Sequence, residues 1–168
     1  FSSEFPWGYF QTANYGEKKR ENDFGNYIDS CSFNHVLYDN QFYYFYRRFN
    51  ILLSPLKEKK LIRFKLNLTM YDPRYKEETC GIPHCDLSGM PEAEKIKGYK
   101  TAIYYINDSS GDTIIYNEKF GSDLSNLTIK ERVTPKRGRM VIFDGDLLHS
   151  GNCPRDENPR IVANINMV

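Results

Sequence analysis

The feature that most constrains the fold is a change in the spacing of apolar residues at Leu61. In LIRFKLNLTMY (61–71), apolar side chains occupy every second position from Ile62 to Met70, and mostly polar side chains lie between them. A period of two is the period of a β-strand. Such a strand packs its apolar face on a core and turns its polar face either to water or to a polar cavity.

Five further strand-like segments follow at short spacing, separated by turn residues. They are YKTAIYYIN (99–107), TIIYN (113–117), LTIKERVT (127–134), RMVIFD (139–144) and RIVANINMV (160–168). Before Leu61, Phe42, Phe45, Phe49 and Leu53 recur at helical spacing until Pro55, which predicts a helix at about residues 40–54. The sequence therefore predicts a mainly β fold, an antiparallel sandwich or barrel with an N-terminal helical cover.

Length and charge narrow the organisation and the partners. A chain of 168 residues predicts a single domain, with residues 1–60 as the N-terminal cover and residues 61–168 as the β core. Lys and Arg total 23 against 22 Asp and Glu, so we expect neither a nucleic-acid partner nor a strong membrane field. No apolar run reaches 18 residues, so no membrane-spanning helix is expected.

The four cysteines, Cys31, Cys80, Cys85 and Cys153, match no disulfide framework of secreted proteins. We interpret them as reduced thiols, and we therefore expect the protein to lie in a cytoplasm.

Two of the three histidines lie in a pattern that suits a metal. In PHCDLSG (83–89), His84 and Asp86 are two residues apart, so in an extended segment both side chains point to the same face. His149 follows 65 positions after His84 (149 − 84), at the end of VIFDGDLLHSG. A jelly roll brings distant strands together, and the three side chains would then share one face of an ion. This ligand set with open positions opposite is that of non-haem Fe(II) oxygenases.

Other interpretations of these residues are weaker. A zinc site from Cys80, His84 and Cys85 requires adjacent His and Cys ligands on one tetrahedral ion, and no second Cys pair completes it. His84 and His149 could also be ordinary polar residues of surface loops. We interpret His35 as structural or exposed, because it has no acidic neighbour at metal-ligand spacing.

A possible carboxylate anchor follows the last histidine. Arg160 lies eleven residues after His149 (160 − 149), at the head of the final strand. A buried arginine holds a carboxylate through two parallel hydrogen bonds. Tyr71 and Tyr105 could donate their phenol protons to the same carboxylate.

The order of these motifs resembles a known family. His84-x-Asp86, then IYYIN (103–107), a Gly-Asp-Thr turn at 111–113, PKRGRMVIFDGDLLHSG (135–151) and Arg160 together resemble the 2-oxoglutarate/Fe(II)-dependent dioxygenases. Within that superfamily the chain is most similar to the prolyl-4-hydroxylase-like branch. It resembles especially the small oxygenases of marine phages, including the cyanophage type, which often carry an FPW segment like residues 5–7. The resemblance is close over residues 60–168 and loose before them.

The resemblance implies a fold, cofactors and roles. The fold would be a double-stranded β-helix, or jelly roll. Fe(II) would be bound by His84, Asp86 and His149, and the distal carboxylate of 2-oxoglutarate by Arg160, Tyr71 and Tyr105. The enzyme would use O₂ to hydroxylate a substrate C–H bond, releasing succinate and CO₂. Peptidyl proline is the substrate class that the resemblance favours, and a phage-encoded enzyme would work in the host cytoplasm.

Some positions depart from the family pattern. Relatives usually have Gly-Gly-Thr or Gly-Gly-Ile where this chain has Gly-Asp-Thr at 111–113, which predicts a tighter and more polar turn. Cys85 lies between two ligands, where strand alternation turns it away from the metal but leaves it at risk of oxidation. Substrate selectivity is expected in a flap at residues 79–100 and a rim loop at residues 117–126.

Two other functions stay open at this point. The chain could be a non-catalytic jelly-roll module of a phage that binds a metal or ligand. It could also be a cupin-type oxygenase that does not use 2-oxoglutarate. Release of succinate would separate the proposed enzyme from the first alternative, and turnover without 2-oxoglutarate would indicate the second.

Overall fold

The computed structural model describes residues 8–10, 27–28, 32–39, 54–56, 59–73, 80–88 and 96–168. This part of the chain consists of β-strands with two short 3-10 helices, Ser54–Leu56 and Leu124–Asn126. The helix predicted at about residues 40–54 lies almost wholly outside it. In the ranges given, no helix is long and apolar enough to cross a membrane.

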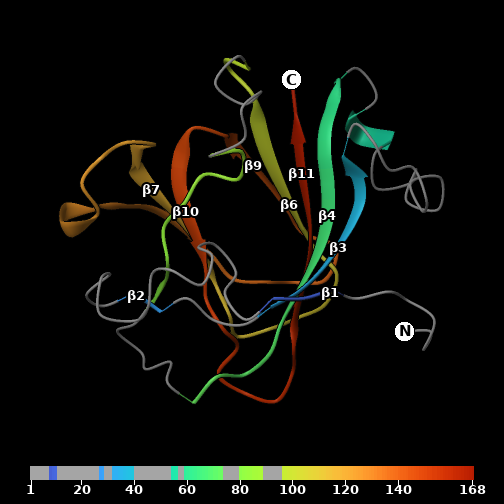
Figure 1. Ribbon diagram of the computed structural model, residues 1–168. Coiled ribbons are helices and arrows are strands. Elements are labelled where there is room, and N and C mark those ends of the chain that lie inside the picture. Colours follow the sequence, from blue (N-terminus) through green and yellow to red (C-terminus); the bar gives the residue numbers. More distant parts are fainter. Residues whose placement is uncertain are drawn as a thin grey trace.

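Two antiparallel sheets form the body of the molecule (Figure 1). The large sheet has the strand order β1 (Gly8–Phe10), β3 (Ser32–Asp39), β4 (Leu61–Thr69), β11 (Arg160–Met167), β6 (Lys100–Tyr105) and β9 (Met140–Asp144). The small sheet has the order β10 (Leu147–Gly151), β7 (Thr113–Lys119) and β8 (Ile129–Val133). A short parallel pair joins β2 (Tyr27–Ile28) to β5 (Cys80–Gly81).

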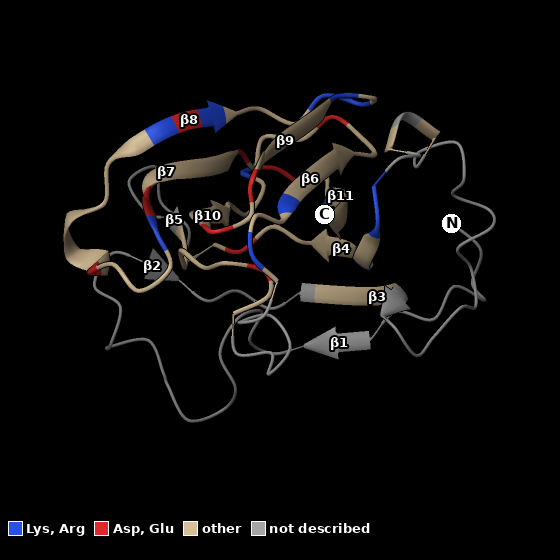
Figure 2. Ribbon diagram, turned by 90° about the horizontal axis from the view of Figure 1, so that it is seen from above, with Lys and Arg blue, Asp and Glu red and all other residues tan. Residues whose placement is uncertain are grey.

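The strands of the two sheets lie on opposite sides of the molecule when it is seen from above (Figure 2). The charged strand β8 lies at the outer edge of the small sheet, and four of its five residues are exposed. Each of the six predicted strands is present, and the predicted jelly-roll fold is confirmed. The sequence did not predict β10 as a strand of its own.

The apolar side chains of β4 form part of the outer face of the large sheet. Phe64 and Leu66 lie opposite Ile165 and Ala163 of β11 in the register, and all four are buried. They belong to a cluster drawn entirely from large-sheet strands: Leu37, Phe64, Leu66, Ala102, Ala163, Ile165 and Met167. This is the predicted apolar surface, and its burial removes about 1.5–3 kcal/mol of unfavourable hydration for each large side chain.

A second cluster lies between the two sheets. It contains Ile103, Tyr105, Phe143 and Val162 from the large sheet and Ile115 and Leu147 from the small sheet. Successive side chains of a β-strand point to opposite faces, and the apolar side chains of β4 lie on the outer face. Its polar side chains therefore point to the space between the two sheets. The register accordingly places Arg63 opposite Asn166 and Lys65 opposite Asn164 of β11. The polar face of β4 therefore lines a polar interior.

The turn between β9 and β10 is fixed by a close backbone approach. A Cβ atom on Gly145 would lie 2.0 Å from the ring of Tyr99, so only glycine fits there. The amide of Gly145 donates a hydrogen bond to the Tyr99 carbonyl at 2.8 Å. The pairing of β10 with β7 then shifts register between Leu147 and His149. Such an irregularity re-aims the side chain that follows it, here His149.

Candidate metal centre

Two histidines from distant parts of the chain face each other across a β-bridge. The backbone amide of His84 donates to the His149 carbonyl at 2.9 Å, and the amide of His149 donates back at 3.0 Å. Directly opposed residues of an antiparallel pair point their side chains to the same face. The two imidazole rings consequently lie 4.8 Å apart, centroid to centroid.

Each histidine uses one ring nitrogen within its own segment. Nδ1 of His84 lies 2.9 Å from the Ile82 carbonyl, and Nδ1 of His149 lies 3.2 Å from the Leu147 carbonyl. A carbonyl only accepts, so Nδ1 carries the proton in both rings, and Nε2 offers a lone pair. A backbone carbonyl on the far ring nitrogen is the usual arrangement for a metal-binding histidine.

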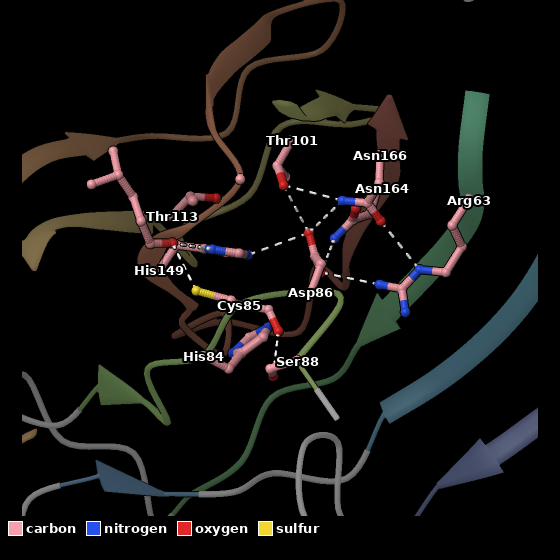
Figure 3. Close-up of polar contacts among 12 residues, drawn as sticks. Arg63, His84, Cys85, Asp86, Ser88, Thr101, Thr113, His149, Asn164 and Asn166 are labelled. Atoms are coloured by element: carbon pink, nitrogen blue, oxygen red, sulfur yellow. Dashed lines mark hydrogen bonds and ion pairs between the residues drawn. The ribbon is translucent and has the colours of Figure 1, made fainter. Parts of the chain in front are cut away.

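The carboxylate of Asp86 completes the group (Figure 3). Its Oδ2 atom lies 3.6 Å from Nε2 of His149. One ligand atom from each of His84, Asp86 and His149 lies within 4.8 Å of the others. Nε2 of His149 is buried and has no hydrogen-bond partner among the described residues. A buried nitrogen lone pair beside a carboxylate is satisfied by a cation, so the residues fit a metal ion.

The donor set narrows the kind of metal. Two imidazole nitrogens and one carboxylate oxygen lie close enough together to bind one ion. That set suits a divalent transition metal, with Fe(II) as the characteristic ion of a two-histidine, one-carboxylate face. The predicted ligands His84, Asp86 and His149 are thus brought together.

Electrostatics favour the metal-binding forms of His84 and Asp86 at neutral pH. Burial, and then the proximity of His149, lower the pKa of His84 to about 4, so its ring is neutral and able to bind a metal. Burial alone would raise the pKa of Asp86, but the charge and hydrogen bond that His149 supplies when its ring is protonated, together with the charges of Arg63 and Lys65, outweigh burial and hold that pKa well below its usual value. Asp86 is therefore an ionised carboxylate.

Cys85 points away from the metal group, as strand alternation predicts. Its Sγ donates to the carbonyl oxygens of Asp146 and Leu147 at 3.3 and 3.4 Å. The side chain packs in a cluster with Ile114, Tyr116 and Leu148. Burial raises the pKa of the thiol to about 12, and the neutral thiol is the unreactive form. The direction of the side chain excludes a zinc site that includes Cys85, and its sensitivity to oxidation stays a prediction.

Arg160 lies in a second buried polar cluster at the start of β11. Its Nε donates to the Gly111 carbonyl at 2.8 Å, and its Nη2 donates to Oγ1 of Thr113 at 2.7 Å. The hydroxyl of Tyr105 donates to the same Thr113 oxygen at 2.8 Å, and the Tyr105 ring lies 6.0 Å from the guanidinium carbon. Gly151 passes close by, since a Cβ atom there would lie 3.2 Å from the guanidinium group.

The cluster joins two of the three predicted anchor residues and leaves out the third. Arg160 and Tyr105 are buried and share Thr113. Tyr71 lies two residues beyond Thr69, the residue that pairs with Arg160, and its side chain is 49% exposed. The assignment of Arg160, Tyr105 and Tyr71 to 2-oxoglutarate stays a prediction.

Sequence reasoning missed the residues that surround Asp86. Oδ1 accepts from Asn164 Nδ2 at 2.8 Å and from Arg63 Nη2 at 3.2 Å. Oδ2 accepts from Asn166 Nδ2 at 3.0 Å and from Thr101 Oγ1 at 3.3 Å. The sequence signal for them was present in RIVANINM (160–167), a buried strand that contains two asparagines. Asn164 and Asn166 lie an even number of positions after Arg160, so all three side chains point to the same face of the sheet.

The two predicted substrate loops differ in how much of them the structure describes. Residues 89–95 of the flap lie outside the described part, whereas residues 80–88 carry the two ligands. The predicted rim loop is largely ordered structure. It contains the end of β7, a turn, and the 3-10 helix Leu124–Asn126, which Asp123 caps by accepting from the Ser125 amide.

Comparisons place the fold among known structures. No protein-family model matches the sequence, and no curated protein matches it. The structure resembles an oxidoreductase of the 2OG-Fe(II) oxygenase family from Burkholderia pseudomallei, with a TM-score of 0.61 and 10% identity over 98% of this chain and 74% of that one.

The structure also resembles SnoN, a non-heme alpha-ketoglutarate-dependent epimerase of nogalamycin biosynthesis. The TM-score is 0.56 at 15% identity, over 82% of this chain and 62% of SnoN. A second structure of SnoN, in complex with Fe³⁺, alpha-ketoglutarate and nogalamycin RO, gives a TM-score of 0.50 at 16% identity over 82% of this chain and 63% of that one. The chain therefore spans less than two thirds of the length of SnoN. At these identities the resemblances establish the shared jelly-roll fold.

Proposed function

We propose that this protein is an Fe(II)- and 2-oxoglutarate-dependent dioxygenase that hydroxylates a substrate C–H bond. The observation that carries the proposal is the convergence of His84, Asp86 and His149, whose ligand atoms lie within 4.8 Å of one another inside the jelly roll. The fold shared with a 2OG-Fe(II) oxygenase supports it.

His84, Asp86 and His149 would hold the iron. Iron held there, together with 2-oxoglutarate and O₂, would supply the oxidant for a substrate C–H bond, and 2-oxoglutarate would leave as succinate and CO₂. The protein contributes the positions of the groups. The two Nδ1–H bonds to carbonyl oxygens keep the histidine rings directed inward, and the ionised Asp86 balances part of the metal charge.

The distal carboxylate of 2-oxoglutarate would be received by Arg160. This guanidinium is buried and faces the interior from the same strand that contacts Asp86. Arg160 and Tyr105 both donate hydrogen bonds to the hydroxyl oxygen of Thr113, which fixes the position of the guanidinium. In a buried site a charge-assisted pair with a carboxylate contributes more than a neutral hydrogen bond, by a factor of about two.

The direct test measures the conversion of 2-oxoglutarate to succinate with Fe(II) and O₂. We expect the parent protein to release succinate, and His149→Ala to lose this activity together with metal affinity. His35→Ala is the matched control, because His35 lies on β3 outside the metal group. If the parent protein bound iron but 2-oxoglutarate did not change its visible spectrum, the proposed role of 2-oxoglutarate as co-substrate would be refuted. Substrate turnover without 2-oxoglutarate would indicate a cupin-type oxygenase.

For the substrate we propose peptidyl proline, as the resemblance to prolyl-4-hydroxylases implies. Asn67 and Asn164 each have a buried Oδ1 atom without a hydrogen-bond partner among the described residues. A buried acceptor gains free energy from a donor, and peptide N–H groups are such donors. This supports a substrate that carries amides. Screening proline-containing peptides for stimulated succinate release tests the proposal, and a response to small amino acids alone would contradict it.

Three wider assignments accompany this function. We propose that residues 1–168 form one oxygenase domain, that its relatives are phage-encoded enzymes, and that it works in a cytoplasm, the host's if a phage encodes it. Cys85 is a buried free thiol, which supports a reducing compartment. Cell fractionation tests the location, and secretion of the protein in disulfide-bonded form would contradict it.

A further inference from the structure

A closed ring of hydrogen bonds joins Asp86 to two residues of the large sheet. Arg63 Nη2 donates to Asp86 Oδ1 at 3.2 Å, and Arg63 Nε donates to Asn166 Oδ1 at 3.2 Å. Asn166 Nδ2 then donates to Asp86 Oδ2 at 3.0 Å, which closes the ring (Figure 3). The three side chains come from β4, β11 and the segment after β5, and all point to one place.

The register of the sheet builds this ring. Arg63 and Asn166 are directly paired across β4 and β11, so their side chains are neighbours on the inner face. Asn166 is fully buried, and the side chain of Arg63 is only 14% exposed. Because these two residues lie on strands in the middle of the large sheet, the ring has a rigid support.

The chemistry of the three groups gives the ring one direction. A guanidinium has no acceptor, so the amide of Asn166 must present Oδ1 to Arg63 and Nδ2 to Asp86. Arg63 therefore holds one carboxylate oxygen directly and the other through Asn166. Asn164 adds a second donor to Oδ1 at 2.8 Å. The oxygen that faces Nε2 of His149, at 3.6 Å, is Oδ2.

We infer that Arg63 and Asn166 are positioning residues that fix the orientation of the Asp86 carboxylate, so that Oδ2, which faces Nε2 of His149, is the oxygen that binds the metal. This inference rests on the metal centre of the proposed function. It assigns no contact between Arg63 or Asn166 and the metal. It predicts that breaking the ring, with every charge kept, weakens metal binding.

Charge must be kept in the test, because removing a cation near a divalent ion would by itself favour metal binding. Arg63→Lys keeps the positive charge and loses the planar fork that bonds two partners at once. Asn166→Leu keeps a side chain of similar volume and leaves Arg63 in place. It removes the two hydrogen bonds by which Asn166 joins Arg63 to Asp86 Oδ2. Arg132→Lys is the matched control: it makes the same change in a more exposed ion pair, with Asp112 at 3.4 Å.

The measurement is a titration of each metal-free protein with Co(II), followed by the d–d absorption of the bound ion. We expect Arg63→Lys and Asn166→Leu each to weaken Co(II) binding by about 10–100-fold and to change the band shape, as loss of a ligand's hydrogen-bond partner does. The double variant should bind about as weakly as the weaker single variant, because the ring is broken only once. Arg132→Lys should match the parent.

Circular dichroism and thermal melting of the metal-free proteins show which variants are folded. Should Asn166→Leu not fold, Arg63→Lys decides, because Arg63 reaches the edge of the buried region and tolerates the shorter cation. Co(II) affinity within about 3-fold of the parent, with an unchanged band, would leave Arg63 a merely structural role and overturn the inference. Failure of the proposed function looks different: the parent then binds Co(II) but its spectrum does not respond to 2-oxoglutarate.

Discussion

Replacing Asp86 by asparagine should destabilise the metal-free protein strongly. The carboxylate accepts four hydrogen bonds, from Arg63, Asn164, Asn166 and Thr101. In either orientation, an asparagine amide would turn its NH₂ group toward two of these donors. The substitution also leaves the buried guanidinium of Arg63 without its counter-charge. Breaking one partner of a buried pair costs about 3–5 kcal/mol.

That cost corresponds to a fall in Tm of about 6–20 °C, at about 2–4 °C per kcal/mol for a chain of this size. Thermal unfolding in the presence of a chelator, followed by circular dichroism, measures it. The matched control is Asp144→Asn, which neutralises a carboxylate in the exposed ion pair with Lys100. Exposed pairs contribute about 0–1 kcal/mol, so this control should lose under about 4 °C. Equal melting temperatures for Asp86→Asn and Asp144→Asn would refute the reasoning.

Three further predictions use single substitutions. Arg160→Leu should raise the 2-oxoglutarate concentration needed for half-maximal succinate release by about 10–100-fold, because a charge-assisted pair is lost; an unchanged requirement would remove Arg160 as the anchor. Burial, and then Arg63, lower the pKa of Lys65 to about 8 from 10.5. The unfolded state therefore holds more protons between these values, and stability should rise with pH from about 8 to 10.5. Lys65→Met should abolish that rise and stabilise the protein at pH 7 by up to about 3 kcal/mol, measured by urea unfolding. Gly145→Ala should cost about 1–3 kcal/mol in the same assay, because its Cβ would lie 2.0 Å from the Tyr99 ring.

Much of the fold could be predicted because a half-buried strand shows alternating apolar and polar residues in its sequence. The alternation from Leu61 predicted β4 and its two faces, and Arg160–Val168 predicted the final strand. The candidate metal ligands were predicted from residue types rather than from a period. A chain with three histidines offers few combinations of ligands. His84 lies two residues before Asp86, and His149 lies eleven residues before Arg160.

The surroundings of the ligands could not be predicted in this way. Whether the polar face of β4 meets water or a cavity depends on which sheet covers it, and a period of two is the same in both cases. Pairing β4 with β11 put Arg63 beside Asn166, 103 positions apart in the chain. No local spacing rule connects such residues.

The sequence by itself therefore determined the types of the elements and which three side chains are the candidate metal ligands. Local periodicity and the chemistry of residue types are enough for both. Only the tertiary structure decided what holds the ligands in place: the bridge between His84 and His149, the ring around Asp86, and the contact of Arg160 with Thr113. These depend on sheet register and on burial, which arise when distant strands pack together and water is excluded from between them.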